Sequence, residues 1–372
     1  MKIGIPKEVK NREYRIGATP AAVRAFCDAG HTVYVQADGG SAIGYTNELY
    51  RQAGAEIKKE AAEVWQAEMV VKVKEPQESE FAHMQEGQIL FCYLHLAPEP
   101  VLTERLIQKK VIAIAFETVT DKEGRLPLLL PMSEIAGRLS IEVGGWALQV
   151  AQGGKGILIG GVPGVRAAKV LILGGGTAGT EAARMALGAG ADVTILDRDL
   201  SRLGKLDQLF GPPLKTLYSS TAAIEEMLPR TDLLIGAVLI PGKSAPKLIQ
   251  RAMLKKMEPK SVIVDISIDQ GGCTETSRPT THDNPIYEVD GIVHYCVTNM
   301  PGSVARTATE ALANATTSYV LTLAQKGWKQ ALANHPGLKN GLNVCYGKVT
   351  NREVAHDLGY EYVSPDTFFG DG

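Results

Sequence analysis

Lys72 and Lys74 lie two residues apart in the sequence VVKVKEP (70–76). The valines of this sequence suit a buried strand. Residues two apart in an extended chain share one face, so Lys72 and Lys74 are expected to point the same way. Such a face is usually solvated, but an ammonium at the end of a strand can also stabilise developing charge on a substrate oxygen. We interpret Lys74 as the functional lysine and Lys72 as its solvent-side neighbour.

Two further groups that could do chemistry follow other predicted strands. His95 comes directly after QILFCYL (88–94), and Arg15 lies in the loop after KIGIP (2–6). Ligands of parallel sheets bind beyond the carboxyl ends of the strands, so these two side chains and Lys74 should share one edge. Singly, a histidine between leucines is more often a core residue. Together, a guanidinium for a carboxylate, an ammonium for a carbonyl oxygen and an imidazole for proton transfer suit a 2-oxo or 2-amino acid.

The sequence LGGGTAG contains a dinucleotide-binding pattern. Gly174, Gly176 and Gly179 fit G-x-G-x-x-G directly after a predicted strand and before a predicted helix, where they allow a tight turn, close approach of a pyrophosphate and helix–strand packing. The next predicted strand ends in Asp197, 23 residues after Gly174, where a carboxylate can bind the ribose hydroxyls. This acid repels a 2′-phosphate and favours NAD over NADP, although the neighbouring Arg198 could accommodate that phosphate.

The rule on strand ends predicts more cofactor contacts in the second half of the chain. Asp269 follows the apolar strand SVIVD in the sequence SIDQGG, where its carboxylate would face the nicotinamide and the substrate. Taken alone, Ser219 and Val238 suit a turn or a core at least equally well. The other positions at these strand ends are Leu239, Ile266, Ser267, Ile268, Val297, Thr298, Asn299 and Met300.

Short apolar runs alternate with amphipathic stretches along most of the chain. Strands are predicted at 2–6, 31–36, 69–73, 88–94 and 111–116, and then at 168–173, 192–197, 214–219, 232–238, 261–267 and 291–297. Runs rich in Val, Ile and Leu that are separated by helices indicate parallel sheets covered on both faces. We therefore predict an α/β protein with two doubly wound, Rossmann-like domains separated by a cleft.

A linker is predicted between these two series of strands. Pro127 and Pro131 mark it, and Ser133 is well placed to cap a helix that connects the domains. After a long predicted helix at 303–327, the last 45 residues are too few for a third domain. We expect a discontinuous substrate domain of residues 1–128 and 306–372, and an NAD-binding domain of residues 129–305.

Composition restricts the possible partners. The 372 residues are 45% hydrophobic and 22% charged, with a net charge of −2, so no basic field attracts nucleic acid or an anionic membrane. No apolar run approaches the roughly 18–20 residues of a membrane span, and the N-terminus is too charged for a secretory signal. The five scattered cysteines contain no C-x-x-C, which indicates reduced thiols. We expect a cytoplasmic protein that acts on small molecules.

The ordered set of motifs resembles the alanine dehydrogenase family over nearly the whole chain. The matching stretches are GIPKEVKNREYRIGATP, MVVKVKEP, FCYLHLA, PLLLPMSEIAGRLS, GGVPGV, ILGGGTAGTEAA, DLLIGAVLIPG, DISIDQGGC and NMPG. The resemblance implies NAD-dependent, reversible oxidative deamination of L-alanine to pyruvate and ammonia. It also implies a substrate domain formed from both chain ends, and a homohexamer. No metal is needed for this chemistry.

The resemblance assigns roles to individual residues. Arg15 and Lys74 bind the substrate carboxylate and carbonyl, while His95 and Asp269 form the acid–base pair. Two departures from the family pattern, Ser267 in place of alanine and Thr298 in place of proline, bear on local NAD contacts only. The NAD contacts that the resemblance adds are Ser133, Thr177, Ala178, Arg202 and Arg278.

Three alternatives remain open. The NAD-binding component of a proton-translocating transhydrogenase shares the motifs, but the histidine of FCYLHLA and the absence of a membrane segment argue against it. A saccharopine dehydrogenase would need a wider pocket than Tyr93, Leu129 and Met132 suggest. A non-enzymatic NAD-binding protein would not need the complete set of Arg15, Lys74 and the proposed acid–base pair.

Overall fold

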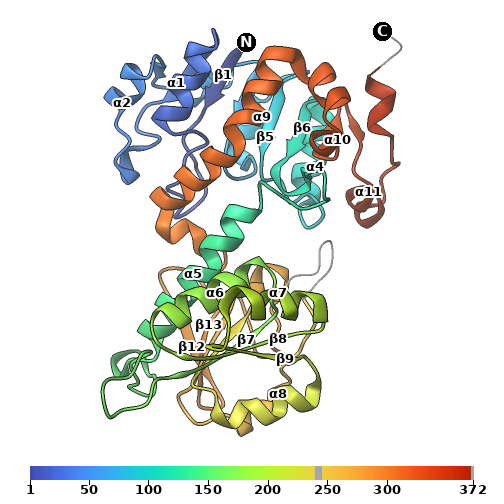
Figure 1. Cartoon of the computed structure of the whole chain (residues 1–372). Coiled ribbons are helices and arrows are strands. Elements are labelled where there is room, and N and C mark those ends of the chain that lie inside the picture. Colours follow the sequence, from blue (N-terminus) through green and yellow to red (C-terminus); the bar gives the residue numbers. More distant parts are fainter. Residues whose placement is uncertain (239–244, 370–372) are drawn as a thin grey trace. The chain divides into compact units, whose positions relative to one another are not determined.

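The structure, a computed structural model, describes residues 1–238 and 245–369. The chain divides into two compact units, residues 1–131 together with residues from 304 onward, and residues 132–303. Each unit has its own sheet and helices (Figure 1). The predicted α/β class, with two parallel-dominated, Rossmann-like sheets, is confirmed. No helix among the described residues is long and apolar enough to cross a membrane.

The first unit is built on a sheet of eight strands in the order β15-β14-β6-β5-β4-β1-β2-β3. Strands β1 to β6 are parallel, whereas β14 is antiparallel to β6 and β15 is antiparallel to β14. Their bounds are β1 Lys2–Ile5, β2 Thr32–Gln36, β3 Glu56–Lys58, β4 Met69–Val71, β5 Ile89–Cys92, β6 Ile112–Ala115, β14 Leu342–Cys345 and β15 Lys348–Val349.

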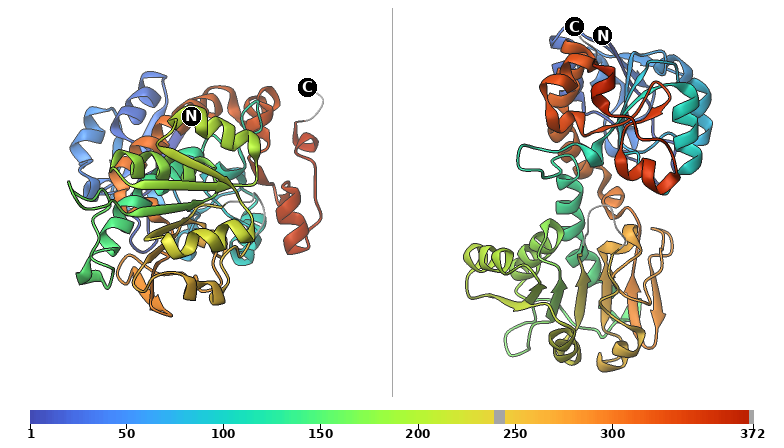
Figure 2. Two further views of the ribbon diagram at one scale, coloured as in Figure 1. Left: turned by 60° about the horizontal axis from the view of Figure 1, so that its bottom comes forward. Right: turned by 90° about the vertical axis from the view of Figure 1, so that its right-hand side faces the viewer.

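Helices cover both faces of this sheet, and α4 and α9 lie on opposite sides of it (Figure 2). Helices α4 and α11 contribute Leu102, Leu106 and Val354 to a core that also contains Leu90 and Cys92 of β5. Burial of this apolar surface, at about 25 cal/mol per Å², holds the helices against the strands. The helices are α1 Pro20–Asp28, α2 Asn47–Gln52, α3 Ala61–Val64, α4 Pro100–Lys109, α9 Ala305–Asn334, α10 Pro336–Lys339 and α11 Arg352–Leu358.

The second unit has a seven-stranded sheet in the order β12-β13-β11-β10-β7-β8-β9. All neighbours are parallel except β12 and β13. The chain order reverses at β7, between β8 and β10, which is where a doubly wound sheet binds its ligand. The strands are β7 Lys169–Leu173, β8 Asp192–Asp197, β9 Leu214–Tyr218, β10 Leu233–Gly236, β11 Val262–Asp265, β12 Ile286–Val289 and β13 Ile292–Tyr295.

Helices lie on both sides of this second sheet as well. Figures 1 and 2 show α6 (Thr177–Gly188) and α7 (Leu200–Phe210) on one side and α8 (Thr221–Met227) on the other. The buried residues of α8 and of the strands meet in a core that includes Ile224, Leu234 and Ile263. Strands β10 and β11 are buried at every residue, so both of their faces are covered and their sequences do not alternate.

The helix predicted to be capped by Ser133 begins earlier, so that prediction is wrong. Helix α5 runs Leu130–Ala147 and contains Ser133 in its first turn. The chain already turns at Leu126, whose carbonyl accepts hydrogen bonds from the amides of Leu129 and Leu130. Proline needs no partner for its nitrogen in a first turn, so Pro131 lies inside the helix rather than in a linker.

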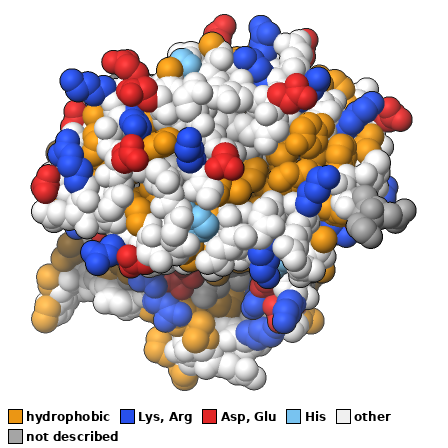
Figure 3. Space-filling view, turned by 90° about the horizontal axis from the view of Figure 1, so that it is seen from above, with side chains coloured by type: hydrophobic (Ala, Val, Ile, Leu, Met, Phe, Trp, Pro, Cys, Tyr) orange, Lys and Arg blue, Asp and Glu red, His pale blue; other side chains and the backbone are white. Residues whose placement is uncertain are grey.

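The surface carries charges of both signs. On the face shown in Figure 3, Lys and Arg side chains are interspersed with Asp and Glu. No field of one sign is visible on that face. Long-range steering of a charged macromolecule would need such a field.

Candidate functional site

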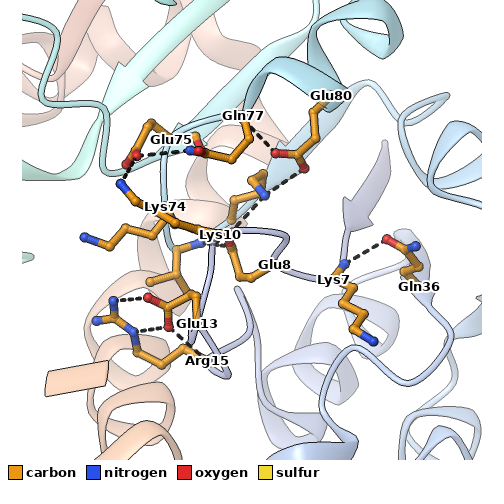
Figure 4. A network of polar contacts seen from close by, with 12 residues as sticks. Lys7, Glu8, Lys10, Glu13, Arg15, Gln36, Lys74, Glu75, Gln77 and Glu80 are labelled. Carbon is orange, nitrogen blue, oxygen red and sulfur yellow. Dashed lines mark hydrogen bonds and ion pairs between the residues drawn. The ribbon is translucent and has the colours of Figure 1, made fainter. Parts of the chain in front are cut away.

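Arg15 and Lys74 lie at the carboxyl edge of the first sheet. They follow β1 and β4, which are neighbours in the sheet. Burial lowers the pKa of Lys74, and the positive charge of Arg15 lowers it further, which places the two cations within electrostatic reach of each other. Figure 4 shows both side chains on the same side of the network that surrounds them. The predicted cluster of these two groups is present.

The Arg15 guanidinium is 2% exposed and is oriented by Glu13. Its Nε and Nη2 donate to the two Glu13 carboxylate oxygens, each at 2.6 Å. Burial opposes both charges, but the pairing raises the pKa of Arg15 and lowers the pKa of Glu13. Such a bidentate pair fixes the plane of a guanidinium. We did not predict Glu13, although it stands only two residues before Arg15.

The Lys74 ammonium differs from that of its neighbours. Among the described residues, none accepts a hydrogen bond from Lys74 Nζ or forms an ion pair with it (Figure 4). The nearby Lys10 is bound to Glu75 at 2.5 Å instead. A partly buried ammonium without a partner beside a guanidinium suits an anionic or carbonyl oxygen of a ligand.

Lys72 is buried rather than solvated, so the prediction of a solvent-side neighbour is wrong. Strand β4 ends at Val71, so the alternation of faces does not carry through to Lys74. Lys72 is 0% exposed, and its ammonium donates to Glu8 Oε2 at 3.1 Å and to Glu80 Oε1 at 2.8 Å. Glu8, far earlier in the chain, and Glu80, a short distance after Lys72, thus hold inward a side chain that we expected in solvent.

His95 follows β5 at the same sheet edge, where its side chain is exposed. Its ring stacks on Tyr93, with centroids 5.8 Å apart and planes inclined by 4°. The backbone has φ +48°, a left-handed conformation that costs a non-glycine residue of order 1–3 kcal/mol. The Glu117 carboxylate accepts hydrogen bonds from the backbone N–H groups of Leu94 and His95, the latter at 2.6 Å.

Glu117 also lies beside the imidazole. Its Oε1 is 3.9 Å from His95 Nδ1. The residue belongs to the 3₁₀ turn Phe116–Thr118 after β6, the next strand of the sheet. It both stabilises the strained turn and can orient the ring, as a carboxylate does for a catalytic histidine. Sequence reasoning missed it, although strand order and the edge rule could have placed it there.

The glycine loop of the second unit has the geometry that a pyrophosphate requires. Gly174 has φ +99°. A Cβ at Gly179 would lie 1.8 Å from the Gly174 carbonyl oxygen, whereas a Cβ at Gly176 would meet no described atom within 4 Å. Gly176 is the N-cap of α6 and gives no side-chain cap hydrogen bond to the first amides of the helix, those of Thr177, Ala178 and Gly179. These residues fit a dinucleotide phosphate.

Asp197 ends β8 beside this loop. Its Oδ2 accepts from the Gly175 amide at 2.7 Å and from Arg202 at 3.1 Å. Burial opposes the charge, but the amides of Asp199 and Gly175, with Arg202, lower the pKa of the Asp197 carboxyl. The carboxylate is therefore held ionised at the glycine loop, in the position expected for binding ribose hydroxyls.

A pocket of about 200 Å³ lies beyond the ends of the neighbouring strands of the second sheet. Ser219, which follows β9, lines it together with Arg198, Lys247 and Leu248. Arg198 and Ser219 therefore line the same pocket. The size of the pocket and its place next to Asp197 suit the adenosine end of a dinucleotide.

The turn that carries Asp269 is fixed by a buried acid. Asp265, the last residue of β11, accepts from the amides of Ser267 (3.1 Å) and Cys273 (2.8 Å) and from the Ser277 hydroxyl (2.5 Å). This holds the 3₁₀ turn Ile266–Gln270. Asp269 itself is exposed, and its Oδ1 accepts from the Asn299 amide at 3.3 Å. Sequence reasoning missed Asp265 because it lies inside an apolar run.

The remaining predicted cofactor residues are distributed around this edge. Ser267 donates its hydroxyl to the Val238 carbonyl at 2.8 Å, which joins two of the predicted segments. Arg278 lies over the Tyr287 ring, 4.3 Å from its centroid. Ile266 and Thr298 are partly exposed, Ile268, Val297 and Met300 are buried, and Leu239 lies outside the described residues.

The fold, the glycine loop and the strand-end acid define a dinucleotide-binding α/β protein. A family model described as alanine dehydrogenase/PNT, C-terminal domain, matches residues 140–352, and that of the N-terminal domain matches residues 4–136. The chain belongs to the alanine dehydrogenase/PNT family.

Individual relatives are similar over their full length. The chain is 52% identical to alanine dehydrogenase of Halomonas elongata, covering 100% of both chains. It is 55% identical to alanine dehydrogenase of Methanococcus maripaludis over 97% of this chain and 98% of that one. A solved structure of L-alanine dehydrogenase matches with a TM-score of 0.94 at 50% identity, covering 96% and 99% of the two chains. A transhydrogenase structure from Sinorhizobium meliloti matches at 0.80 and 22% identity, over 95% and 99%, which shows the fold alone.

Proposed function

We propose that this chain is an NAD-dependent amino-acid dehydrogenase that catalyses the reversible oxidative deamination of L-alanine to pyruvate and ammonia. Full-length relatives more than half identical carry the name alanine dehydrogenase. The observation that supports this chemistry best is the Lys74 ammonium, which has no partner among the described residues and lies within electrostatic reach of the Glu13-held Arg15. That pair suits a small molecule with adjacent carboxylate and carbonyl groups.

The two units take different roles in this proposal. Residues 1–128 and 306–372 form the substrate domain, and residues 129–305 bind NAD. The glycine loop holds the pyrophosphate, Asp197 the ribose, and the pocket beside Ser219 the adenine. The other predicted cofactor residues, with Ser133 and Arg278 among them, complete the set. When bound, NAD accepts the hydride from the alanine Cα.

The chain's own residues then handle charge and protons. Arg15 binds the substrate carboxylate. Lys74 stabilises the oxygen charge that develops on the carbinolamine, and in the reverse direction it polarises the pyruvate carbonyl. The Asp269 carboxylate stabilises the iminium, and His95 with Asp269 transfers protons as water adds and ammonia leaves. No metal ion is required in these steps.

Alanine-dependent NADH formation at alkaline pH tests this function directly. The parent chain should turn over L-alanine, and Lys74→Ala should lose on the order of a hundred- to a thousand-fold in kcat. Lys74→Arg should fail as well, because a planar guanidinium does not replace a compact ammonium. An active Lys74→Ala variant would remove Lys74 from the mechanism, and an inactive parent with normal NAD binding would refute the function.

The alternative functions have less support. The transhydrogenase structure shares the fold alone, and a transhydrogenase component has no use for the histidine that we place in proton transfer. A saccharopine dehydrogenase is excluded if lysine with 2-oxoglutarate gives no oxidation of NADH while pyruvate with ammonia does. A non-enzymatic NAD-binding protein is excluded by turnover of alanine itself.

We also propose a homohexamer in the cytoplasm. The family resemblance supports the hexamer, and the five free cysteines support a reducing compartment. Sedimentation of the purified chain should give six times its 39.9 kDa mass. A monomer or dimer at micromolar concentration would contradict the hexamer, and recovery with the membrane or secreted fraction would contradict the location.

A further inference from the structure

A buried lysine binds two carboxylates two residues before Lys74, and the mechanism above makes no use of it. Lys72 is 0% exposed, and Glu8 and Glu80 are 6% and 3% exposed. The ammonium lies 3.1 Å from Glu8 and 2.8 Å from Glu80. We call these three residues the buried triad.

The buried triad connects the two segments that carry Arg15 and Lys74. Glu8 lies in the loop after β1, which continues to Arg15. Its Oε2 is bound by Lys72, while its Oε1 accepts from the Val73 amide at 2.7 Å and from the Lys74 amide at 3.4 Å. Glu8 therefore binds the backbone of Lys74 itself.

Glu80, the third member of the buried triad, holds the segment that follows Lys74. Glu80 uses Oε1 for Lys72 and Oε2 for the Gln77 amide at 2.9 Å. Gln77 in turn donates to Glu75, next to Lys74 (Figure 4). The segment from residue 72 to residue 80 is thus closed on itself around the triad, and Lys74 projects from it.

Stability alone does not explain such an arrangement. The desolvation of buried charges often exceeds their attraction, so well-packed apolar residues would serve stability as well or better. Apolar residues could not accept hydrogen bonds from the amides of Val73 and Lys74, nor bind the Lys72 ammonium at the same time, as Glu8 does. The arrangement defines the position of one backbone segment against another.

We propose that Lys72, through Glu8, is a positioning residue for substrate binding. It holds the Lys74 backbone against the Arg15 loop, so that ammonium and guanidinium meet the carbonyl and carboxylate of one 2-oxo acid. This inference rests on the function proposed above. Small displacements of such groups, of about 1 Å, can cost on the order of a hundred-fold.

Two variants test the inference in pyruvate reduction. Lys72→Met removes the link and keeps the apolar stem, and Glu8→Gln keeps an amide oxygen for the Val73 N–H but cannot form the ion pair. Glu8→Gln keeps the inference falsifiable if Lys72→Met does not fold. Each folded variant should raise KM for pyruvate on the order of ten- to a hundred-fold, with a smaller change in kcat. NADH affinity, measured by fluorescence, should stay within about twofold because its proposed contacts belong to the other unit.

A matched control is available in the second unit. Lys155 also binds two carboxylates, Asp232 at 2.6 Å and Glu258 at 2.5 Å, and Asp232 lies at the amino end of β10, away from the proposed cofactor edge. Both Lys155→Met and Lys72→Met should lower the melting temperature, because each leaves two carboxylates without their ammonium, but Lys155→Met should not change KM for pyruvate. A merely structural triad would give the same result at both lysines.

The outcomes separate this inference from the proposed function. Normal KM for pyruvate in a folded Glu8→Gln or Lys72→Met variant, with an active parent, would overturn the positioning role. Equal KM changes in Lys155→Met would overturn it too. Absence of pyruvate reduction in the parent would instead refute the function.

Discussion

At the scale of single residues, three of the proposed catalytic or binding groups are held by acids that we did not predict. Glu13 orients Arg15, Glu117 holds the turn at His95, and Asp265 holds the turn before Asp269. Arg15, Lys74 and His95 could be predicted because each has a suitable functional group and follows an apolar run that predicts a strand. The roles of the supporting acids were not predicted, because each depends on which amide or guanidinium its carboxylate binds. Strand order could have placed Glu117 at the edge of the sheet, but not its hydrogen bond to the His95 amide.

The first prediction at this scale concerns pH. Burial and the charge of Arg15 lower the pKa of Lys74, and the protonated form is the one that polarises pyruvate. Log kcat/KM for pyruvate should therefore be constant at pH values below the pKa of Lys74 and should decrease above it. The decrease should begin below the ordinary lysine pKa of about 10.4. The residual activity of Lys74→Ala should lack this descent. A descent that survives in Lys74→Ala would belong to another group.

The second prediction concerns cofactor choice at Asp197. In Asp197→Ser the carboxylate that repels a 2′-phosphate is lost, so discrimination between NAD and NADP should fall about tenfold or more. Affinity for NAD should also decrease, because Asp197 binds Gly175 and Arg202. If Arg198 receives the phosphate, adding Arg198→Ala should reverse the gain in NADP use. An unchanged preference for NAD would assign the selection to another residue.

At the scale of elements, the apolar runs predicted the positions of the main strands but not the residues at which these strands end. Strand β4 stops at Val71, and the residue after it turns inward because Glu8 and Glu80 neutralise it. The strands β3 and β15 have three and two residues, too short for a periodic pattern. Strand β14 contains Asn343, whose side-chain amide donates hydrogen bonds to the nearby Gly341 carbonyl and to the Thr118 hydroxyl, which is distant in sequence. Local patterns carry none of this information.

The glycine loop with α6 gives a prediction for an element. In Gly179→Ala the new Cβ would lie 1.8 Å from the Gly174 oxygen, so the loop must shift and NADH affinity should fall at least about tenfold. Gly188→Ala, at the other end of α6, meets no described atom within 4 Å. It should leave NADH affinity unchanged and stabilise by about 0.5–1 kcal/mol. Fluorescence titration and thermal denaturation distinguish the two, and equal affinities would contradict our assignment of the loop.

At the scale of the whole molecule, the chain leaves its first sheet, builds a second one and returns, adding β14 and β15 to the first. The proposed acid–base pair is divided between the units: His95 belongs to the first and Asp269 to the second. We propose that both side chains transfer protons in the oxidation of alanine. Groups that act as a unit in one step are strongly non-additive, whereas independent groups multiply their effects.

The most direct measurement of this claim is kcat for L-alanine oxidation in His95→Ala, Asp269→Ala and the double variant, with NADH affinity as the control for folding. Each single change should lower kcat on the order of a hundred- to ten-thousand-fold. The double variant should be scarcely slower than the slower single one, and NADH affinity should change little in His95→Ala. Near-normal turnover in His95→Ala, or losses that multiply in the double variant, would contradict joint proton transfer by His95 and Asp269.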